Sequence, residues 1–471
     1  MIGSLLSLVT LSVMVGYLGQ SGFGVYSTAL AFVFLFNYLA DFGLYSYLVR
    51  EISRAGAAAK KLVSNVFTLR LAALLLFGGA APVVAFAFPY DSELRLTILI
   101  MTMFFVFSSL SQVLMGVFQR FLRTDLVTFA EIVGRVAQLG LVVWFVSLDV
   151  GLASMAGALS LSALAACALT FGFARRFVPF TLGFDFKLWK SVLKESWPIG
   201  VAVVFTVLYF KLDTVILSLY QPDAHVGIYN MGYRILEALV FFPAMFVGLI
   251  MPMMSHHADS ALGVVKTAAQ QASAKLQVVV QRTLNVLIFV TLPLAALLIV
   301  RAGDIIALID RKAQFNEAAG VLAVLAIALV AIYFGALFSN ALIALHKQRI
   351  LMKIYAFGAA FNIILNFLII PRHSYLGASW TTVATEIAVT ILMILVLSKA
   401  AKPGAAVSVS WARALPVVAA TAIMTLVLIA TPSIHVILAA ALAGLAYLAV
   451  AWLLKGIAAS DIAFIRTNTT V

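Results

Sequence analysis

The sequence predicts an all-α polytopic membrane protein of about fourteen transmembrane helices: two six-helix lobes in a parallel repeat around a central cavity, plus two extra C-terminal helices. The chain has 471 residues, of which 64% are hydrophobic and only 10% are charged, whereas roughly a quarter of the residues in soluble domains carry a charge. Apolar runs long enough to cross a bilayer recur along the chain, and short motifs of its first half recur in its second half. These observations exclude a soluble protein.

Charged residues, prolines and glycines divide the apolar runs into fourteen candidate spans. A helix rises 1.5 Å per residue, so about 20 apolar residues cross the hydrocarbon core. The spans lie near residues 1–19, 24–49, 62–88, 96–118, 126–148, 150–174, 196–220, 226–255, 278–300, 317–345, 350–370, 374–398, 411–431 and 434–454. The first run lacks a basic leader and a cleavage motif, so we expect a span there and not a signal peptide.

Basic residues are distributed unequally between the two sets of loops. The loops after the even-numbered spans, with the C-terminal tail, hold 22 of the 31 lysines and arginines, whereas the opposite loops hold five. The positive-inside rule then places both termini in the cytoplasm. We expect the plasma (inner) membrane as the location of the protein. Anionic lipid on the cytoplasmic side accounts for the basic excess, so we expect no nucleic-acid partner.

Two short motifs recur at corresponding places. GVYS at 24–27 opens the second span and GIYN at 227–230 opens the eighth, while GLAS at 151–154 resembles LGAS at 376–379. Six spans separate the equivalent elements, and because six is even the two lobes have the same orientation. The predicted organisation is an N-lobe at 1–174, a cytoplasmic linker at 175–195, a C-lobe at 196–400, and two further helices with a tail at 401–471.

The linker contains an amphipathic segment, FDFKLWKSVLKESW at 184–197. Its apolar side chains share one helical face and its lysines share another, which is typical of a helix that lies in the membrane interface. We expect it to lie on the inner leaflet, with a solvated linker as the alternative. The apolar residues are Phe186, Trp189, Val192 and Leu193, and the lysines are Lys187, Lys190 and Lys194.

The hairpin at 195–257 carries charges well inside its apolar runs. Each such charge costs about 2.5–3.5 kcal/mol unless it is paired or hydrated. Asp213 and Arg234 lie at similar distances from the turn, so we expect them to pair and to leave Lys211 facing a water-filled space. Glu237 shares the helix face of Arg234. The alternative is a self-neutralised cluster that holds two helices together.

Other spans carry further charged and polar side chains. Arginine grips phosphate in a bidentate manner, so cations in a hydrated path favour an anionic headgroup as cargo. Each polar residue alone is equally explained by an interhelical hydrogen bond. We assign Arg70, Arg135, Lys211 and Arg234 to substrate binding; Asp41, Glu131, Asp213, Glu237 and Glu386 to charge pairs or ion coupling, with Glu131 able to neutralise Arg135; and Asn37, Asn65, Gln138, Tyr233, Asn362 and Asn366 to the cavity lining.

Signals of an enzyme are absent from the sequence. The six histidines lie in turns or near span ends without metal-ligand spacing, and there is no nucleophile elbow or phosphate-binding glycine loop. We therefore expect neither catalysis nor a cofactor. The sequence leaves open whether H⁺, Na⁺ or the membrane potential drives turnover. A glycan polymerase would need a large outer loop, and the longest outer loop here is 301–316.

Five segments carry a resemblance to a known family. They are YLGQSGFGVYSTAL at 17–30, LADFGLYSYLVREISR at 39–54, LDTVILSLYQPDAHVGIYNMGYRILE at 212–237, MPMMS at 251–255, and the segment 341–386, which contains FNIILNFLIIPRHSYLGASWTTVATE. In combination these segments resemble the polysaccharide-transporter branch of the MOP superfamily, the Wzx-type flippases of lipid-linked oligosaccharides.

The resemblance implies two six-helix lobes that form a V around a cationic cavity. It also implies a polyprenyl-pyrophosphate-linked glycan as cargo, moved to the outer leaflet, with membrane lipids and the glycan polymerase machinery as partners. Asp213, Arg234 and Asn366 lie in matching motifs, whereas Arg70 and Arg135 rest on the burial argument alone. Two alternatives stay open: a lipid II flippase, and a MATE-like antiporter of drugs or cations that relies on acidic residues such as Asp41 and Glu386.

Overall fold

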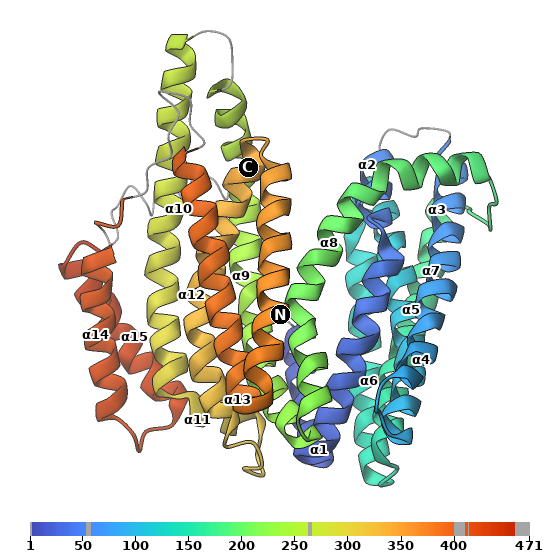
Figure 1. The fold of residues 1–471 in the computed structure, drawn as a ribbon, viewed down its shortest axis with the longest axis horizontal. Coiled ribbons are helices and arrows are strands. Elements are labelled where there is room, and N and C mark those ends of the chain that lie inside the picture. The colour runs from blue at the N-terminus through green and yellow to red at the C-terminus, as the bar shows by residue number, and fades with distance from the viewer. Residues whose placement is uncertain (1, 53–57, 262–265, 400–409, 413, 457–471) are drawn as a thin grey trace. The chain divides into compact units, whose positions relative to one another are not determined.

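The computed structural model describes residues 2–52, 58–261, 266–399, 410–412 and 414–456 (Figure 1). Within these residues all regular secondary structure is helical, which confirms the predicted all-α class. Ten of the described helices are long and apolar enough to cross a membrane, judged by length and composition. The protein is therefore a polytopic membrane protein, as its composition indicates.

The chain divides into two units, and each is described by itself. The first contains the chain up to Asn230 together with Ile309–Gln314, and the second contains Met231–Leu308 and the chain from Phe315 onward. The boundary lies inside a helix. The lobe limits expected from the sequence, 1–174 and 196–400, stay a prediction.

The first unit is a bundle in which α5, α6 and α7 pack on one another and α1 packs on α5, α6 and α8. Its helices are α1 (Ile2–Asp41), α2 (Leu44–Ile52), α3 (Ala59–Ala73), the π-turn η2 (Leu74–Gly78), α4 (Gly79–Val84), the 3₁₀-turn η3 (Ala85–Ala87), α5 (Ser92–Arg120), α6 (Thr124–Ser147), α7 (Gly151–Phe177), α8 (Phe186–Tyr220) and the start of α9 (Asp223–Ala261).

In the second unit α12 packs on α10 and α13, and α14 packs on α10 and α15. Its helices are the rest of α9, α10 (Lys266–Val300), α11 (Ala302–Ile309), α12 (Ala318–Ala344), α13 (Gln348–Lys399), α14 (Ala414–Ala430) and α15 (Val436–Leu453). The two C-terminal helices therefore associate with this unit through α10.

Two of the longest helices contain a residue with non-helical backbone angles. Ser374 has φ 51° and ψ −138° inside α13, and Asn362 Nδ2 on one side of it donates to Thr385 Oγ1 on the other at 3.4 Å. The two arms of α13 therefore lie side by side as a hairpin. Gly19, at φ 62° and ψ −171°, interrupts α1 in the same way, and glycine tolerates a positive φ without a steric cost.

These interruptions reconcile the helices with the predicted spans. The breaks at Gly19 and Ser374 divide α1 and α13 into two segments each, and α8 and the 17-residue α14 stand beside the ten long apolar helices. The described residues then contain fourteen helical segments, one for each of the predicted spans. The predicted number of about fourteen agrees with this arrangement.

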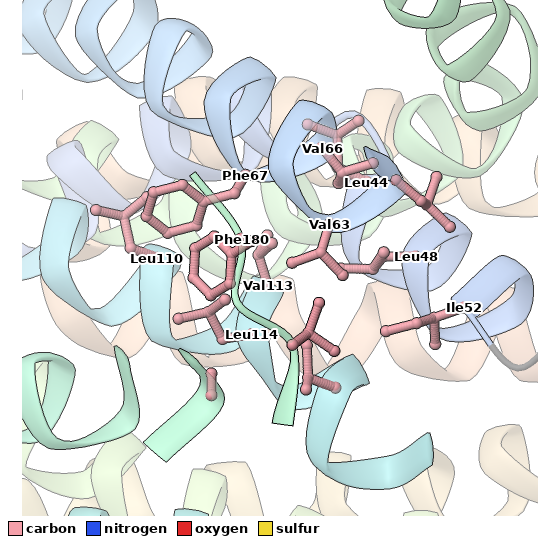
Figure 2. Packing of buried hydrophobic residues seen from close by; sticks show 14 of the residues in the cluster. Leu44, Leu48, Ile52, Val63, Val66, Phe67, Leu110, Val113, Leu114 and Phe180 are labelled. Atoms are coloured by element: carbon pink, nitrogen blue, oxygen red, sulfur yellow. The ribbon is translucent and has the colours of Figure 1, made fainter. Parts of the chain in front are cut away.

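A hydrophobic cluster holds α2, α3 and α5 together (Figure 2). Leu48, Val63 and Val113 are fully buried in it. Phe180, from the segment between α7 and α8, enters the same cluster and packs its ring 5.2 Å from that of Phe67. The connection after α7 is therefore anchored by apolar packing.

One polar face of α3 also binds this connection. The backbone N–H of Thr181 donates to Ser64 Oγ at 3.2 Å, that of Gly183 to Thr68 Oγ1 at 2.9 Å, and that of Asp185 to Asn65 Oδ1 at 2.7 Å. Thr68 lies three and four residues after Asn65 and Ser64, so the three acceptors share one side of the helix. Residues 181–185 are therefore fixed before α8 begins.

Asp185 caps α8 and gives this region a pH dependence. Its Oδ1 accepts from the N–H groups of Lys187 and Leu188, both at 3.1 Å, and its Oδ2 lies 2.7 Å from Lys61 Nζ. The ammonium group of Lys61 and the hydrogen bond from Leu188 lower the pKa of Asp185 below its usual value of 3.8. The charged carboxylate of Asp185 therefore stabilises the folded protein fully at a pH above the pKa that Asp185 has in the unfolded chain. This stabilisation is lost as the pH falls through the lower pKa that Asp185 has in the folded protein.

Asp185→Asn should remove that dependence. An asparagine still accepts the capping hydrogen bonds but carries no charge, so we expect a lower melting temperature than wild type at neutral pH and a difference that shrinks as the pH falls below about 4. Thermal unfolding in detergent across this pH range measures the difference. A gap that stays constant down to the lowest pH would contradict the assignment.

Helices α1 and α9 cross where the repeated motifs begin. A Cβ at Gly24 would lie 1.8 Å from the carbonyl oxygen of Asp223, and a Cβ at Gly227 would lie 2.1 Å from that of Gln20. The same hypothetical Cβ atoms would lie 3.1 and 3.2 Å from the backbone nitrogen of the other glycine. The two equivalent glycines of the repeat therefore face each other, and only the absence of side chains lets the backbones approach so closely.

Candidate functional site

A buried ion pair joins three helices of the first unit. Arg70, on α3, is fully buried, and its Nη1 donates to Asp41 Oδ1 at the end of α1 at 2.6 Å. Its Nη2 donates to Ser109 Oγ on α5. Asp41 Oδ2 also accepts from the N–H of Gly43 at 3.2 Å. In this conformation the guanidinium has no face open to a phosphate, so the substrate-binding role expected of Arg70 stays a prediction for another conformation.

Two of the cations assigned to substrate binding, both in the first unit, are only half-buried. Lys211, on α8, places its Nζ 5.4 Å from the ring centroid of Phe34 on α1, which is within the range of a cation–π contact. Arg135, on α6, donates to Ser7 Oγ, and its side chain runs beside Gly3. Both retain exposed surface and are suited to meet an anion.

Glu131 and Arg135 do not form the pair that their spacing permits. Among the described residues no ion pair joins them; Glu131 is exposed, and Arg135 bonds to Ser7 on another helix. Gln138 is half-buried on the same helix. On α1, Asn37 is half-buried, and its Oδ1 has no hydrogen-bond partner within the described part of the chain.

Asp213 is buried at 2% exposure and bonds to a residue that sequence reasoning missed. Its Oδ2 accepts from the hydroxyl of Tyr229, which is fully buried on α9, and its Oδ1 accepts from the N–H of Thr214 at 2.6 Å. Reflection about the turn puts Asp213 level with Arg234, so it could not have found Tyr229, which lies five residues nearer the turn. The expected pair with Arg234 stays a prediction, because Arg234 belongs to the second unit.

In the second unit, Arg234 pairs with Glu237 at 3.3 Å, three residues along the same helix. Their side chains are 29% and 31% exposed, so the pair lies in reach of solvent or ligand. Tyr233, beside them in sequence, is buried. An ion pair this exposed contributes only about 0–1 kcal/mol to stability, which leaves Arg234 able to exchange its carboxylate for a phosphate.

The hairpin of α13 encloses a buried polar cluster. Asn366 Nδ2 donates to Asn362 Oδ1 at 2.8 Å, and Asn362 reaches Thr385 across the hairpin. Glu386 follows Thr385 and is 5% exposed. Asn366 Oδ1 and Thr381 Oγ1 are buried without a hydrogen-bond partner among the described residues. Neutral and acidic oxygens gathered in this way can coordinate a hard cation such as Na⁺.

Asn65 has a structural partner that was not expected. It was assigned to a cavity lining, but its Oδ1 accepts from the N–H of Asp185 and from the indole Nε1 of Trp189 at 3.1 Å, and its Nδ2 donates to Lys61 O. The side chain of Asn65 therefore holds the connection between α7 and α8 in place. No local pattern reveals this role, because the partners lie about 120 residues further along the chain.

Arg301 is a second buried arginine that sequence reasoning left in a loop. It is 4% exposed, its Nη1 donates to Thr431 O at 2.8 Å, its Nη2 donates to Ile434 O at 2.7 Å, and its Nε lies 2.6 Å from Asp304 Oδ2. Those carbonyls form the turn between α14 and α15. Arg301 therefore fastens the C-terminal helix pair to the end of α10.

Within the described residues there is no group of three or more histidine, cysteine, aspartate or glutamate side chains placed to hold a metal ion. The single cysteine, Cys167, is buried and unbridged. The polar chemistry of the described residues therefore consists of buried ion pairs, half-buried cations and the polar hairpin of α13.

Comparisons with known proteins agree with this architecture. A family model described as "Polysaccharide biosynthesis protein" matches residues 1–257, and the MatE model matches residues 198–368. No curated protein matches the chain.

Solved structures with the same fold are transporters and flippases. The lipid II flippase MurJ in an inward closed conformation is 14% identical with a TM-score of 0.75, and the match covers 96% of each chain. An inward-facing multidrug resistance MATE family transporter of the MOP superfamily is 15% identical with a TM-score of 0.64, covering 83% of this chain and 93% of that one.

A third structure with this fold is a MOP superfamily transporter from Pyrococcus furiosus, described as having a binding pocket of reverse polarity that suggests a different function. It is 15% identical with a TM-score of 0.57, covering 84% of this chain and 92% of that one. Identities this low show the shared fold alone. Because the first family model matches more than half of the chain, the protein belongs to the polysaccharide biosynthesis protein family.

Proposed function

We propose that the protein flips a polyprenyl-pyrophosphate-linked oligosaccharide across the plasma membrane by alternating access, for the synthesis of a cell-surface polysaccharide. The observation that carries this proposal is the presence of half-buried cations inside membrane-spanning helices. Arg135, Lys211 and Arg234 lie within apolar helices, where an uncompensated charge is costly. A negatively charged headgroup would compensate these charges during transport. The family description supports a glycan as the cargo.

Such a cargo has a polar, negatively charged headgroup that must cross the membrane, and the cationic side chains of the chain can bind it. A hydrated sugar cannot cross hydrocarbon without losing its hydrogen bonds to water, whereas a polyprenyl tail need not leave the bilayer. Arginine supplies paired donors to phosphate oxygens, and lysine supplies a mobile point charge. The glycan polymerase machinery would receive the cargo at the outer leaflet, with both termini of the flippase in the cytoplasm.

The polar cluster of α13 supports a proposal for energy coupling. Asn362, Asn366, Thr381 and Glu386 supply oxygens in a buried place, so Na⁺ or H⁺ would be a co-transported substrate there. Na⁺ would use the amide and hydroxyl oxygens, whereas H⁺ would use the carboxylate of Glu386.

Replacing the three half-buried cations tests the glycan proposal. Charge-assisted hydrogen bonds contribute about 1.5–3 kcal/mol each, so Arg135→Gln, Lys211→Gln and Arg234→Gln together should reduce translocation by at least 100-fold. Proteoliposomes loaded with a fluorescent lipid-linked oligosaccharide, scored by glycosidase access to the outer leaflet, measure the rate. Arg70 is kept in this variant, because its removal would leave Asp41 buried without its cation and would lower the stability of the protein as well as its transport.

The matched control replaces three exposed cations between the predicted spans, Arg311, Lys312 and Arg372, with glutamine, and should leave the rate unchanged. An undiminished rate in the triple cation variant would exclude the cationic path.

A second candidate is antiport of drugs or cations, favoured by the MatE match at residues 198–368. It predicts cationic cargo and dependence on Asp41 and Glu386. The same proteoliposomes, loaded with a cationic dye in place of the glycolipid, separate the two functions. Accumulation of the dye, abolished by Glu386→Gln, would favour antiport. Transport of lipid II in preference to other lipid-linked glycans would indicate a lipid II flippase.

A further inference from the structure

The connection between α7 and α8 presents an exposed surface that is both apolar and basic. Leu182, Phe184 and Phe186 are 55%, 63% and 70% exposed, which is unusual for large apolar side chains outside the hydrocarbon-facing helices. Next to them on the first turns of α8 are three exposed lysines. We call this set the linker surface; it consists of Leu182, Phe184, Phe186, Lys187, Lys190 and Lys194.

The backbone of the linker surface is held in place by packing and hydrogen bonds, so the exposure of its side chains is a property of the folded structure. Phe180 (Figure 2) is buried in the hydrophobic cluster of the first unit. Val192 is buried in the same cluster. Between them the chain is hydrogen-bonded to Ser64, Asn65 and Thr68 of α3. The rings of Phe184 and Phe186 pack 6.1 and 5.2 Å from that of Trp189, which hydrogen-bonds to Asn65.

The acidic residues of this segment are already neutralised. Asp185 pairs with Lys61 at 2.7 Å, and Glu195 pairs with Arg50 at 2.9 Å. Lys187, Lys190 and Lys194 form no ion pair within the part of the chain that the structure describes, and their spacing of three and four residues puts them on one face of α8. The linker surface therefore carries uncompensated positive charge beside exposed aromatic rings.

The position of the linker surface identifies the kind of partner. It includes the connection between α7 and α8, which is hydrogen-bonded to the middle of α3, and both α3 and α7 belong to helices able to cross a membrane. Figure 1 shows α8 first running along this end of the first unit and then turning to run beside α1. Aromatic rings beside lysines at the end of membrane helices fit the boundary between acyl chains and headgroups.

We propose that the linker surface binds the headgroups of anionic lipids, with Phe184 and Phe186 entering the acyl region and the three lysines contacting phosphates. Each lysine near an anionic membrane surface strengthens binding by about fivefold, and three by on the order of 100-fold. This binding is separate from transport, because none of the six residues lies among the cations proposed to meet the cargo. Anionic lipid would hold the connection between α7 and α8 against the membrane.

A lipid titration of the purified full-length protein tests this proposal. In an uncharged detergent, dioleoylphosphatidylglycerol should raise the melting temperature, followed by tryptophan fluorescence, more than equal additions of dioleoylphosphatidylcholine. The variant with Lys187→Gln, Lys190→Gln and Lys194→Gln should need on the order of 100-fold more phosphatidylglycerol for the same rise. The lysines are exposed, so the variant should fold, and far-ultraviolet circular dichroism checks this.

The matched control, Arg311→Gln with Lys312→Gln and Arg372→Gln, removes three exposed charges from other loops and should respond as wild type. An unchanged response of the lysine variant, or equal effects of the two lipids on wild type, would overturn the proposal. Inorganic phosphate that reproduced the rise would indicate a phosphate site. Soluble polyglutamate that did so would indicate an acidic protein partner, and either result would also exclude the lipid assignment.

Discussion

Arg70→Met should destabilise the protein by about 3–5 kcal/mol, because it leaves the carboxylate of Asp41 buried without its cation. Arg70 is fully buried and Asp41 is 9% exposed, so water cannot replace the lost guanidinium. The 2.6 Å bond between them and the bond to Ser109 join α1, α3 and α5. Equilibrium unfolding in detergent measures the loss, and a melting-temperature scan gives a parallel reading.

Two variants distinguish destabilisation by an unpaired buried charge from destabilisation by lost packing. Asp41→Asn combined with Arg70→Met removes both charges, so much of the stability should return. Arg234→Met breaks a pair whose side chains are about one-third exposed, and it should cost no more than about 1 kcal/mol. If Arg70→Met behaved like Arg234→Met, the ion pair would not be the buried support that its geometry indicates.

Gly24→Ala should destabilise the contact between α1 and α9 by about 1–3 kcal/mol or more. Its new Cβ would overlap the carbonyl oxygen of Asp223 at 1.8 Å, and a backbone atom cannot rotate away as a side chain can. Gly227→Ala should have a similar effect, because its Cβ would meet the carbonyl of Gln20. Unfolding measurements on the two single variants and the double variant would show strong non-additivity, since one separation of the helices relieves both overlaps.

Gly140→Ala on α6 is the matched control, because a Cβ there meets nothing within 4 Å. Alanine favours a helix over glycine by up to about 1 kcal/mol, so this variant should be neutral or more stable. Equal stability of Gly24→Ala and Gly140→Ala would show that the helices do not approach as closely as the structure has them.

The succession of helices could be predicted from the sequence, because each span must satisfy its own backbone hydrogen bonds and so carries its signal locally. Residues 374–398, for example, were separated from 350–370 at the proline and basic residues near Arg372, and the backbone of α13 breaks at Ser374. The repeat of GVYS as GIYN likewise marked two helix starts that meet at Gly24 and Gly227.

The partners of the charged residues could not be predicted in the same way. Asp41 and Arg70 are 29 residues apart, and nothing in either helix indicates that their facing sides meet. The spacing within one helix predicts an ion pair between Glu131 and Arg135, yet Arg135 donates a hydrogen bond to Ser7, 128 residues away. Such choices depend on how helices rotate against each other, which the packing of many apolar side chains decides together.

Arg301 has a consequence for how the end of the chain relates to the rest. Its guanidinium satisfies carbonyls at the turn between α14 and α15, and Tyr447 on α15 donates to Phe289 O on α10 at 2.6 Å. A protein shortened after α13 would lose the carbonyl acceptors of Arg301 Nη1 and Nη2, while the contact between Arg301 Nε and Asp304 would stay. The last two helices therefore cannot be deleted without a further change. A variant that ends after α13 would also need an apolar residue in place of Arg301.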